Sequence, residues 1–348
     1  MGKFTEQQLQ LAGSLALERS FVLGNTYLTD KDAAFAGGGF VEGVGSDDAD
    51  VDIYAIRESH LTLAQIDASR YERVLGRGGV RLGIDDRDVE ICRIHTRIPG
   101  TSIKVDVHYR TWDELNGLTV SIHFLHDSGR RSPLAPAEPL PLRDLLFLHR
   151  LYTSHDIQGA DRLARVRQEI GRDRLLYLLY RRKACSRSLL GNLLHAWGQG
   201  AWRQCATLAY EIAVAHFQAY THLLGNTHYH PVWILPYARH RGVSESLVGK
   251  LIRIMVDKES TSDEECRRFV GGCLNFVDEV LAAAVTPLSR IGGHACREAA
   301  CAALEIELAR QPHACPEWEA IYHRKSYGMS DMMMREWLER YGDAVRVP

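Results

Sequence analysis

Four aspartates lie close together in the segment "AGGGFVEGVGSDDADVDIYAI", residues 36–56: Asp47, Asp48, Asp50 and Asp52. Carboxylates at this spacing repel one another, and beside an apolar, β-branched run each is costly unless a cation neutralises it. No Lys or Arg occurs between Lys31 and Arg57, so the segment contains no such cation. The sequence therefore predicts that the cation comes from outside the chain.

The spacing of Asp50 and Asp52 indicates what they could do. Two residues apart in a strand, they leave the same face about 7 Å apart. Asp106 lies on the polar face of a later alternating stretch, "SIKVDVHYR", residues 102–110. If the two strands are neighbours, three carboxylates converge, as in sites that hold two divalent ions about 4 Å apart for in-line phosphoryl or nucleotidyl displacement. Asp88 and Glu90 are rival sources of the third carboxylate.

The elements that must position these carboxylates can be read from hydrophobic periodicity. Leucines and a phenylalanine at helical spacing predict a helix over residues 5–24, which ends at a Gly-Asn pair. Alternating or β-branched stretches predict strands within residues 33–37, 50–56, 70–84, 88–98 and 102–110. The first part of the chain, called the head here, is therefore expected to be a mixed β-sheet flanked by helices.

The character of the chain changes after residues 132–142, "SPLAPAEPLPL", which hold four prolines and can continue neither a helix nor a strand. Beyond them, apolar residues with a 3–4 residue period predict helices within residues 161–197, 201–224, 246–256, 266–285 and 288–348. The predicted fold class is α+β, with the mixed sheet and its helices first and an all-helical part after it.

Composition limits the class of protein. The chain has 348 residues, 45% hydrophobic and 25% charged, and a formal net charge of -2. Near-neutral charge argues against a nucleic-acid acceptor and against a membrane surface. The polar N-terminus lacks the apolar core of a signal peptide, and eight scattered cysteines suit a reducing compartment. We therefore expect a cytoplasmic protein; a homodimer is left open.

Other metal sites fit the sequence less well. A calcium loop that starts at Asp48 would need Gly at its sixth position and Glu at its twelfth, where Ile53 and Ser59 stand. A zinc cluster could be drawn from the C-terminal part, but no CxxC pair exists and the His-x-Cys spacing is poor for tetrahedral zinc. Its candidates are His294, Cys296, Cys301, His313 and Cys315. His228 and His230 are interpreted as loop residues.

With these residues in view, the head resembles the nucleotidyltransferase superfamily, the fold of DNA polymerase beta. Its signature is a hydrophobic residue and two small residues, a gap of some nine to thirteen residues, then Asp-hydrophobic-Asp/Glu-hydrophobic. Gly38-Gly39, ten residues and Asp50-Val51-Asp52-Ile53 fit it; a frame at Gly37-Gly38 fits with a gap of eleven. Asp106 would be the third carboxylate. In layout, the chain is closest to antibiotic nucleotidyltransferases such as kanamycin nucleotidyltransferase.

The resemblance implies roles for particular residues. Asp50, Asp52 and Asp106 would be catalytic and would bind two Mg²⁺ ions, with Mn²⁺ as the alternative. A carboxylate of the helical part would act as the general base, and Glu211 is the candidate. The residues expected to contact the nucleotide are Gly38, Gly39, Gly43, Ser46, Lys183 and Arg187.

The predicted domains follow from the same resemblance: a catalytic domain at 1–131, a linker at 132–142, a helical acceptor-binding domain at 143–287 and a helical extension at 288–348. The expected function is transfer of a nucleoside monophosphate from an NTP, first of all ATP, to a hydroxyl of a small molecule in natural-product resistance or biosynthesis. The alternative is a non-enzymatic nucleotide-binding or regulatory module of the toxin–antitoxin type.

Overall fold

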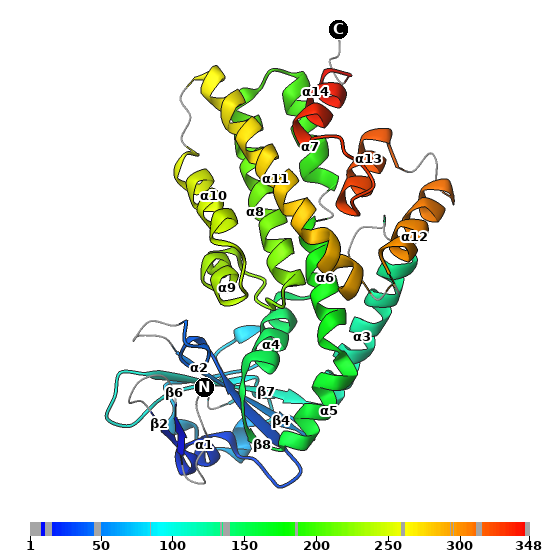
Figure 1. Ribbon diagram of the computed structural model, residues 1–348. Coiled ribbons are helices and arrows are strands. Elements are labelled where there is room, and N and C mark those ends of the chain that lie inside the picture. Colours follow the sequence, from blue (N-terminus) through cyan, green and yellow to red (C-terminus); the bar gives the residue numbers. More distant parts are fainter. Residues whose placement is uncertain are drawn as a thin grey trace. The chain divides into compact units, whose positions relative to one another are not determined.

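The computed structural model describes residues 8–10, 16–44, 50–83, 85–132, 134, 140–184, 187–258, 262–292, 294, 296–310 and 315–344. The fold is α+β, with an N-terminal mixed sheet and its helices followed by a helical part (Figure 1), as the sequence predicts. The chain forms two compact units. The sheet unit comprises Met1–Ser121 and Leu142–Gly171, and the helical unit comprises Ile122–Pro141 and Arg172–Pro348.

The sheet unit is built on a six-stranded sheet of order β5-β6-β7-β4-β3-β8. Its strands are β3 (Ala33–Gly37), β4 (Val51–Arg57), β5 (Arg73–Leu75), β6 (Arg93–Arg97), β7 (Lys104–Thr111) and β8 (His155–Gln158). Strands β4 and β7 pair in parallel, and the other neighbours pair antiparallel. The strands predicted at 33–37, 50–56 and 102–110 are confirmed, whereas β8 was not predicted.

The two faces of this sheet differ in chemistry. Along β7, buried residues alternate with partly exposed ones, as period-two geometry requires. Val51, Ile53, Val105 and Val107 point to one face and form an apolar core with Val22 of helix α1 (Arg19–Thr26). Asp52 and Asp106 necessarily occupy the other face, so the apolar core fixes where the carboxylates point.

Three further helices belong to the sheet unit: α2 (Gly39–Glu42), α4 (Leu142–Thr153) and α5 (Ala160–Ile170). Phe147 of α4 packs against Phe35 and Tyr54 with ring centroids 5.8 and 5.5 Å away. Helix α4 therefore covers the β3–β4 part of the face that carries the carboxylates. Short 3-10 turns occur at Leu63–Gln65, Ala68–Arg70 and Arg77–Gly79, and in the helical unit at Pro231–Trp233.

The helix predicted over residues 5–24 is confirmed only from Arg19 onward and is wrong in the described residues before it. Residues Gln8–Gln10 and Ala16–Glu18 are short strands, β1 and β2, and α1 begins only at Arg19. Leu9 and Leu17 are register partners in this antiparallel pair. Leucines eight residues apart suit one face of a helix, but they also suit facing positions of two short strands, so periodicity alone could not separate the two.

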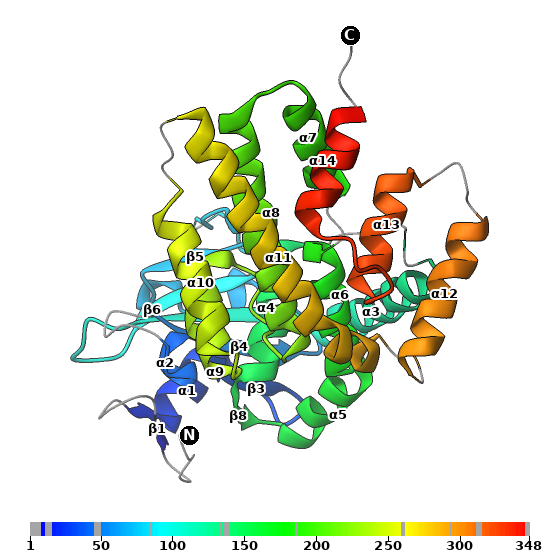
Figure 2. The same cartoon turned by 45° about the horizontal axis from the view of Figure 1, so that its top comes forward.

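The helical unit contains ten helices in the described residues; α3 begins in the sheet unit. They are α3 (Trp112–Arg131), α6 (Arg172–Ala184), α7 (Arg187–Gly198), α8 (Trp202–Leu223), α9 (Ile234–His240), α10 (Glu245–Val256), α11 (Asp263–Ile291), α12 (Arg297–Arg310), α13 (Glu317–Ser326) and α14 (Met334–Ala344). Helices α8 and α11 run side by side (Figure 1), and α13 lies between α12 and α14 (Figure 2).

Helix α11 is long and apolar enough to span a membrane by length and composition alone. However, 56% of its most apolar stretch is buried in the structure, where Val270, Leu274 and Val277 pack into the helical core with α8 and α14. Its apolar character is therefore explained by its place in that core.

Candidate metal and nucleotide site

Two aspartates meet at the centre of the sheet. In the parallel pairing of β4 with β7, Asp52 stands directly opposite Asp106, and Tyr54 stands opposite His108. One ligand atom from each of Asp52, Asp106 and His108 lies within 4.8 Å of the other two. Both carboxylates are largely shielded from water, with side chains 17% and 14% exposed. In the described residues, this is the one group of His, Cys, Asp and Glu close enough to hold a metal ion.

The expectation that the chain offers these carboxylates no cation is wrong. Arg150 of α4 places Nε 3.1 Å from Asp52 Oδ2. His95 of β6 places Nδ1 2.6 Å from Asp106 Oδ1, and Arg93 lies 3.9 Å from the other oxygen of Asp106. These basic groups come from segments far away along the chain, so a search of the neighbouring sequence could not find them.

The surroundings of Asp52 and Asp50 shift their pKa values in opposite directions. Burial by itself raises the pKa of Asp52, but His108, Arg150 and Arg93 outweigh burial and hold that pKa below its usual value. Burial and the negative charge of Asp106 raise the pKa of Asp50. Of these two carboxylates, the fold keeps Asp52 ionised more firmly than Asp50.

The glycines that precede these aspartates have steric reasons to be glycine. A Cβ at Gly37 would lie 2.9 Å from Cδ of Arg150, so its absence lets that side chain reach Asp52. Gly38 has φ +109°, which L side chains rarely adopt, and a Cβ there would lie 2.9 Å from the Asp50 carbonyl oxygen. This glycine turn, residues 37–39, thus brings backbone next to the carboxylates. Either motif frame, Gly37-Gly38 or Gly38-Gly39, falls in it.

Buried polar contacts also link the glycine turn to helix α4. Glu42, at the end of α2, is ion-paired with Arg150 and with Nε2 of His149, the latter at 3.1 Å. The His149 side chain is fully buried and that of Glu42 is 4% exposed. Arg150 therefore joins the turn that carries the glycines to the strand that carries Asp52.

His108 was considered from the sequence only as a surface partner of Asp106. Its ring stacks on Tyr54 with centroids 4.6 Å apart, and Tyr54 stacks on Phe35 at 5.0 Å. Its Nε2 lies 3.4 Å from Asp52 Oδ1 and, within the described part of the chain, has no hydrogen-bond partner. Its position two residues after Asp106 in an alternating strand was the signal that could have identified it.

The other predicted residues of the sheet unit lie as follows. Asp50 is exposed, immediately before β4, and is not part of the group of three. Gly39 begins α2, and Gly43 ends it with φ +68°. Ser46 lies outside the described residues, as do Asp47 and Asp48. The rivals Asp88 and Glu90 are exposed and outside the group of three.

The remaining predicted residues lie in the helical unit, and their roles stay predictions. Glu211 is exposed on α8. Arg187, at the start of α7, places Nε 3.1 Å from Oε2 of Glu319. Burial, followed by the charge of Arg182, lowers the pKa of Lys183.

The cysteines of the described part are free thiols. In that part, Cys296, Cys301 and Cys315 join no metal-ligating group, and His313 lies outside it. Cys301 instead contacts the carbonyl oxygen of Tyr327. His228 stacks on Tyr237 with ring centroids 5.3 Å apart, as a packing residue does.

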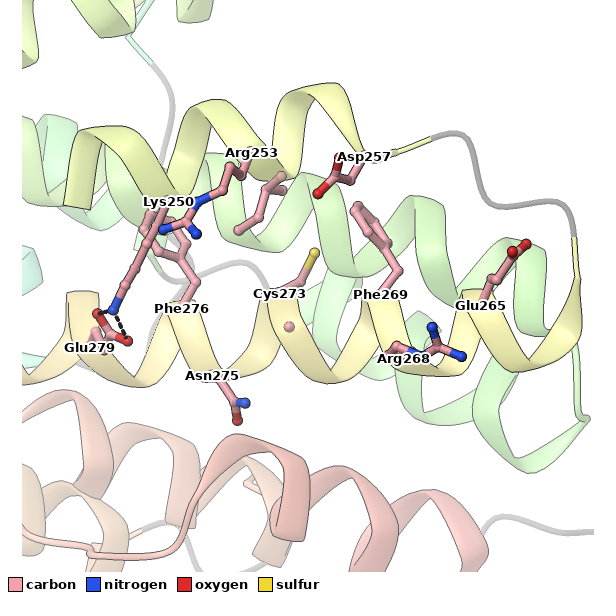
Figure 3. Close-up of a pocket in the computed structure, with 12 residues that line it drawn as sticks. Lys250, Arg253, Asp257, Glu265, Arg268, Phe269, Cys273, Asn275, Phe276 and Glu279 are labelled. Atoms are coloured by element: carbon pink, nitrogen blue, oxygen red, sulfur yellow. Dashed lines mark hydrogen bonds and ion pairs between the residues drawn. The ribbon is translucent and has the colours of Figure 1, made fainter. Parts of the chain in front are cut away.

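The helical unit has its own pocket of about 550 Å³ between α10 and α11 (Figure 3). Phe269 and Phe276 contribute apolar surface, and Lys250 Nζ lies 2.5 Å from Glu279 Oε1. The charged lining residues are Lys250, Arg253, Arg268, Asp257, Glu265 and Glu279. Both signs occur in equal number, so charge favours no class of ligand here.

No family model and no curated protein matches this chain. Among solved structures, it is similar to a nucleotidyltransferase-like protein from Exiguobacterium sibiricum 255-15. The identity is 11%, the TM-score is 0.39, and the match covers 78% of this chain and 77% of the other.

Proposed function

We propose that this protein is a metal-dependent nucleotidyltransferase of the cytoplasm, which transfers a nucleoside monophosphate from an NTP, first of all ATP, to a hydroxyl of a small molecule. The observation that supports the proposal most is the pairing of Asp52 with Asp106 across β4 and β7. The two carboxylates stand at the same register on a polar face, and the basic groups around Asp52 keep it ionised, as a metal ligand must be. A divalent cation bound between Asp52 and Asp106 would explain why both carboxylates are present.

The residues present fit such an ion. Asp52 and Asp106 offer carboxylate oxygens, and the Nε2 of His108 is a buried nitrogen without a hydrogen-bond partner in the described part of the chain. Oxygen ligands suit Mg²⁺ and Mn²⁺, and the imidazole shifts the preference toward Mn²⁺. An ion held there would supply Lewis-acid activation of the phosphate and of the acceptor hydroxyl. Asp50 is the proposed outer ligand of a second ion.

The residues around the site have proposed tasks in the reaction. The backbone of Gly38 and Gly39 lies against the phosphates. Arg150 exchanges Asp52 for phosphate oxygens, which the fork of its guanidinium fits. The acceptor oxygen forms a bond to the α-phosphorus while the bond to the bridging oxygen breaks, and pyrophosphate leaves with the electron pair. The hydroxyl proton passes to a base, for which Glu211 is the candidate.

The test is pyrophosphate release from each NTP with Mg²⁺ or Mn²⁺ and a small-molecule metabolite extract as the source of acceptor. We expect release with at least one NTP that depends on the extract and is lost in Asp52→Asn. That variant is the matched control because it removes the charge of the proposed metal ligand and leaves the size of the side chain unchanged.

One observation favours the alternative, a nucleotide-binding module without activity: Arg150 already contacts Asp52. If the wild-type protein binds an NTP with its metal but releases no pyrophosphate with any extract, the transferase proposal is wrong and the alternative is supported.

A further inference from the structure

Beside the carboxylates, the sheet unit contains a pocket of about 380 Å³ that the proposed reaction has not used. We call it the arginine pocket. Its side-chain lining includes Tyr54, Arg77, Arg93, His108, Arg110 and Arg143. The stacked rings of Tyr54 and His108 form one wall, and a turn that contains Gly78 and Gly79, both with positive φ, forms another. Its size suits a small molecule.

The charge of this pocket is positive. Its lining includes the guanidinium groups of Arg77, Arg93, Arg110 and Arg143 and the single carboxylate of Glu114. That carboxylate is already engaged, since it accepts a hydrogen bond from the Thr111 backbone at 3.0 Å and lies 3.4 Å from Nε2 of His60.

Two of the arginines have no strong acidic partner. The Arg143 side chain is 71% exposed and lies 3.8 Å from Asp144, whose closer partner is Arg110 at 2.7 Å. Arg77 is exposed and forms no ion pair with the described residues. Guanidinium groups that are not neutralised inside a concave site favour an anion with phosphate or carboxylate oxygens.

The arginine pocket adjoins the metal-binding group. His108 belongs to both, and Arg93, which also lines the pocket, lies 3.9 Å from Asp106. The order β5-β6-β7-β4-β3 places Asp52 and Asp106 between two flanks. The glycine turn follows β3 on one flank, and β5 and β6, which line the pocket, form the other.

If the transfer proceeds by in-line displacement, the NTP and the acceptor occupy different flanks of the carboxylates. The attacking and leaving oxygens lie on opposite sides of the α-phosphorus. If the leaving pyrophosphate lies at the glycine turn, the attacking hydroxyl comes from the side of the arginine pocket. We infer that the acceptor is a small anionic hydroxyl compound that binds in this pocket, an inference that rests on the proposed nucleotidyl transfer. A polycationic acceptor would meet like charge there.

The binding test uses inorganic phosphate, with acetate in parallel, titrated into the full chain saturated with Mg²⁺ and α,β-methylene ATP. We expect phosphate to bind while the nucleotide analogue is bound, and to bind at least about tenfold more weakly in the Arg77→Ala/Arg143→Ala double variant. Both side chains are exposed, so the fold should survive. Arg70→Ala removes an exposed arginine outside the pocket and should change nothing. Tighter binding of acetate would assign the pocket to carboxylates.

Two results would overturn the inference: phosphate displaced by the analogue, which would give the pocket to the triphosphate, or phosphate binding that the double variant leaves unchanged. An activity arm separates this from the proposed function. Metabolites retained on an anion exchanger should support pyrophosphate release, and those retained on a cation exchanger should not. Pyrophosphate release with the cationic fraction alone would refute the inference of an anionic acceptor but leave the proposed nucleotidyl transfer intact. No release with any fraction would refute the proposed nucleotidyl transfer.

Discussion

Two buried carboxylate sites of this chain, one in each unit, are neutralised in different ways. Asp278 of α11 is 7% exposed, lies 2.8 Å from Lys325 Nζ of α13, and accepts the Met334 N–H of α14 at 3.1 Å. Asp52 has Arg150 and His108 beside it, but a second carboxylate, Asp106, stands at the same register on the next strand.

The difference also appears in the pKa values. Burial raises the pKa of Asp278 although Lys325 opposes it, whereas the basic groups around Asp52 outweigh its burial and lower its pKa. Asp278, with one ammonium group and one backbone N–H, is enough to join helices α11, α13 and α14. The site of Asp52 and Asp106 contains two carboxylates and several basic side chains, which is more charge than packing requires. The contacts of the helical core account for the Asp278 site, and under the proposed function the Asp52 site would bind a metal ion.

The largest expected effect concerns activity. Asp52→Asn or Asp106→Asn should lower turnover on the order of a thousandfold or more, because each removes a charged ligand from the metal site. The midpoint of unfolding without metal should fall in Asp52→Asn, because the basic groups around Asp52 stabilise its charge and lower its pKa. Steady-state pyrophosphate release and thermal unfolding measure the two. Turnover near that of the wild type in either variant would refute the assignment.

The second effect concerns stability. Asp278→Ala should lower the free energy of unfolding by about 3 kcal/mol or more, because it leaves the Lys325 ammonium buried without its partner. Glu279→Ala, one residue on, is the control. Its pair with Lys250 is 43% and 35% exposed, so the loss should stay below about 1 kcal/mol. Equal losses in the two variants, measured by urea unfolding, would remove the contrast between the two carboxylate sites.

His216, a buried side chain of the helical unit, is neutral rather than ion-paired. His216 places Nδ1 2.7 Å from the Ile212 carbonyl oxygen and Nε2 2.6 Å from the Tyr322 hydroxyl. Burial lowers its pKa from 6.5 to about 4. The unfolded chain therefore binds a proton at this site first as pH falls, and stability present above pH 6.5 is lost toward pH 4, by about 3 kcal/mol.

The check is denaturant unfolding of the wild type and of His216→Phe between pH 7 and pH 4. The variant should start less stable, because it loses the hydrogen bonds, and should lose less stability on acidification. Parallel curves would show that His216 does not titrate in this range.

The smallest effect separates the glycine turn from an ordinary glycine. Gly38→Ala should cost about 1 kcal/mol or more of stability and should weaken activity, because φ +109° and the approach to Asp50 both oppose a Cβ. Gly24 lies in α1 with nothing within 4 Å of an added Cβ, so Gly24→Ala should be neutral or stabilising. A Gly38→Ala protein as stable and active as Gly24→Ala would mean that the turn has no strict geometry.

Local patterns in the sequence predicted the centre of the sheet well. The alternation in residues 102–110 and the apolar run after Asp50 predicted β7 and β4. The two strands are neighbours, the condition on which three carboxylates were expected to converge, but Asp50 does not join Asp52 and Asp106 in the group. The start of α3 also carries a capping box, in which the side chains of Thr111 and Glu114 each accept a hydrogen bond from the other's backbone N–H.

Long-range pairing could not be predicted from the sequence. No local pattern says that Arg150 reaches Asp52, that β6 brings His95 to Asp106, or that β8 joins the sheet beside β3. These contacts depend on the order of the strands and on the packing of α4, which the whole sheet determines. His108 was partly predictable: alternation along β7 puts it on the same face of the sheet as Asp106, but the parallel pairing that brings β4 beside it has no local signal.

The most direct test of the account is a titration of the full chain with Mn²⁺, without nucleotide, followed through the electron paramagnetic resonance signal of the free ion. A saturable site is predicted whose affinity falls about tenfold or more in Asp106→Asn and in His108→Ala. Asp88→Asn, at an exposed rival carboxylate, should bind as the wild type does. Equal binding in all four proteins, or a loss confined to Asp88→Asn, would contradict a metal site at Asp52, Asp106 and His108.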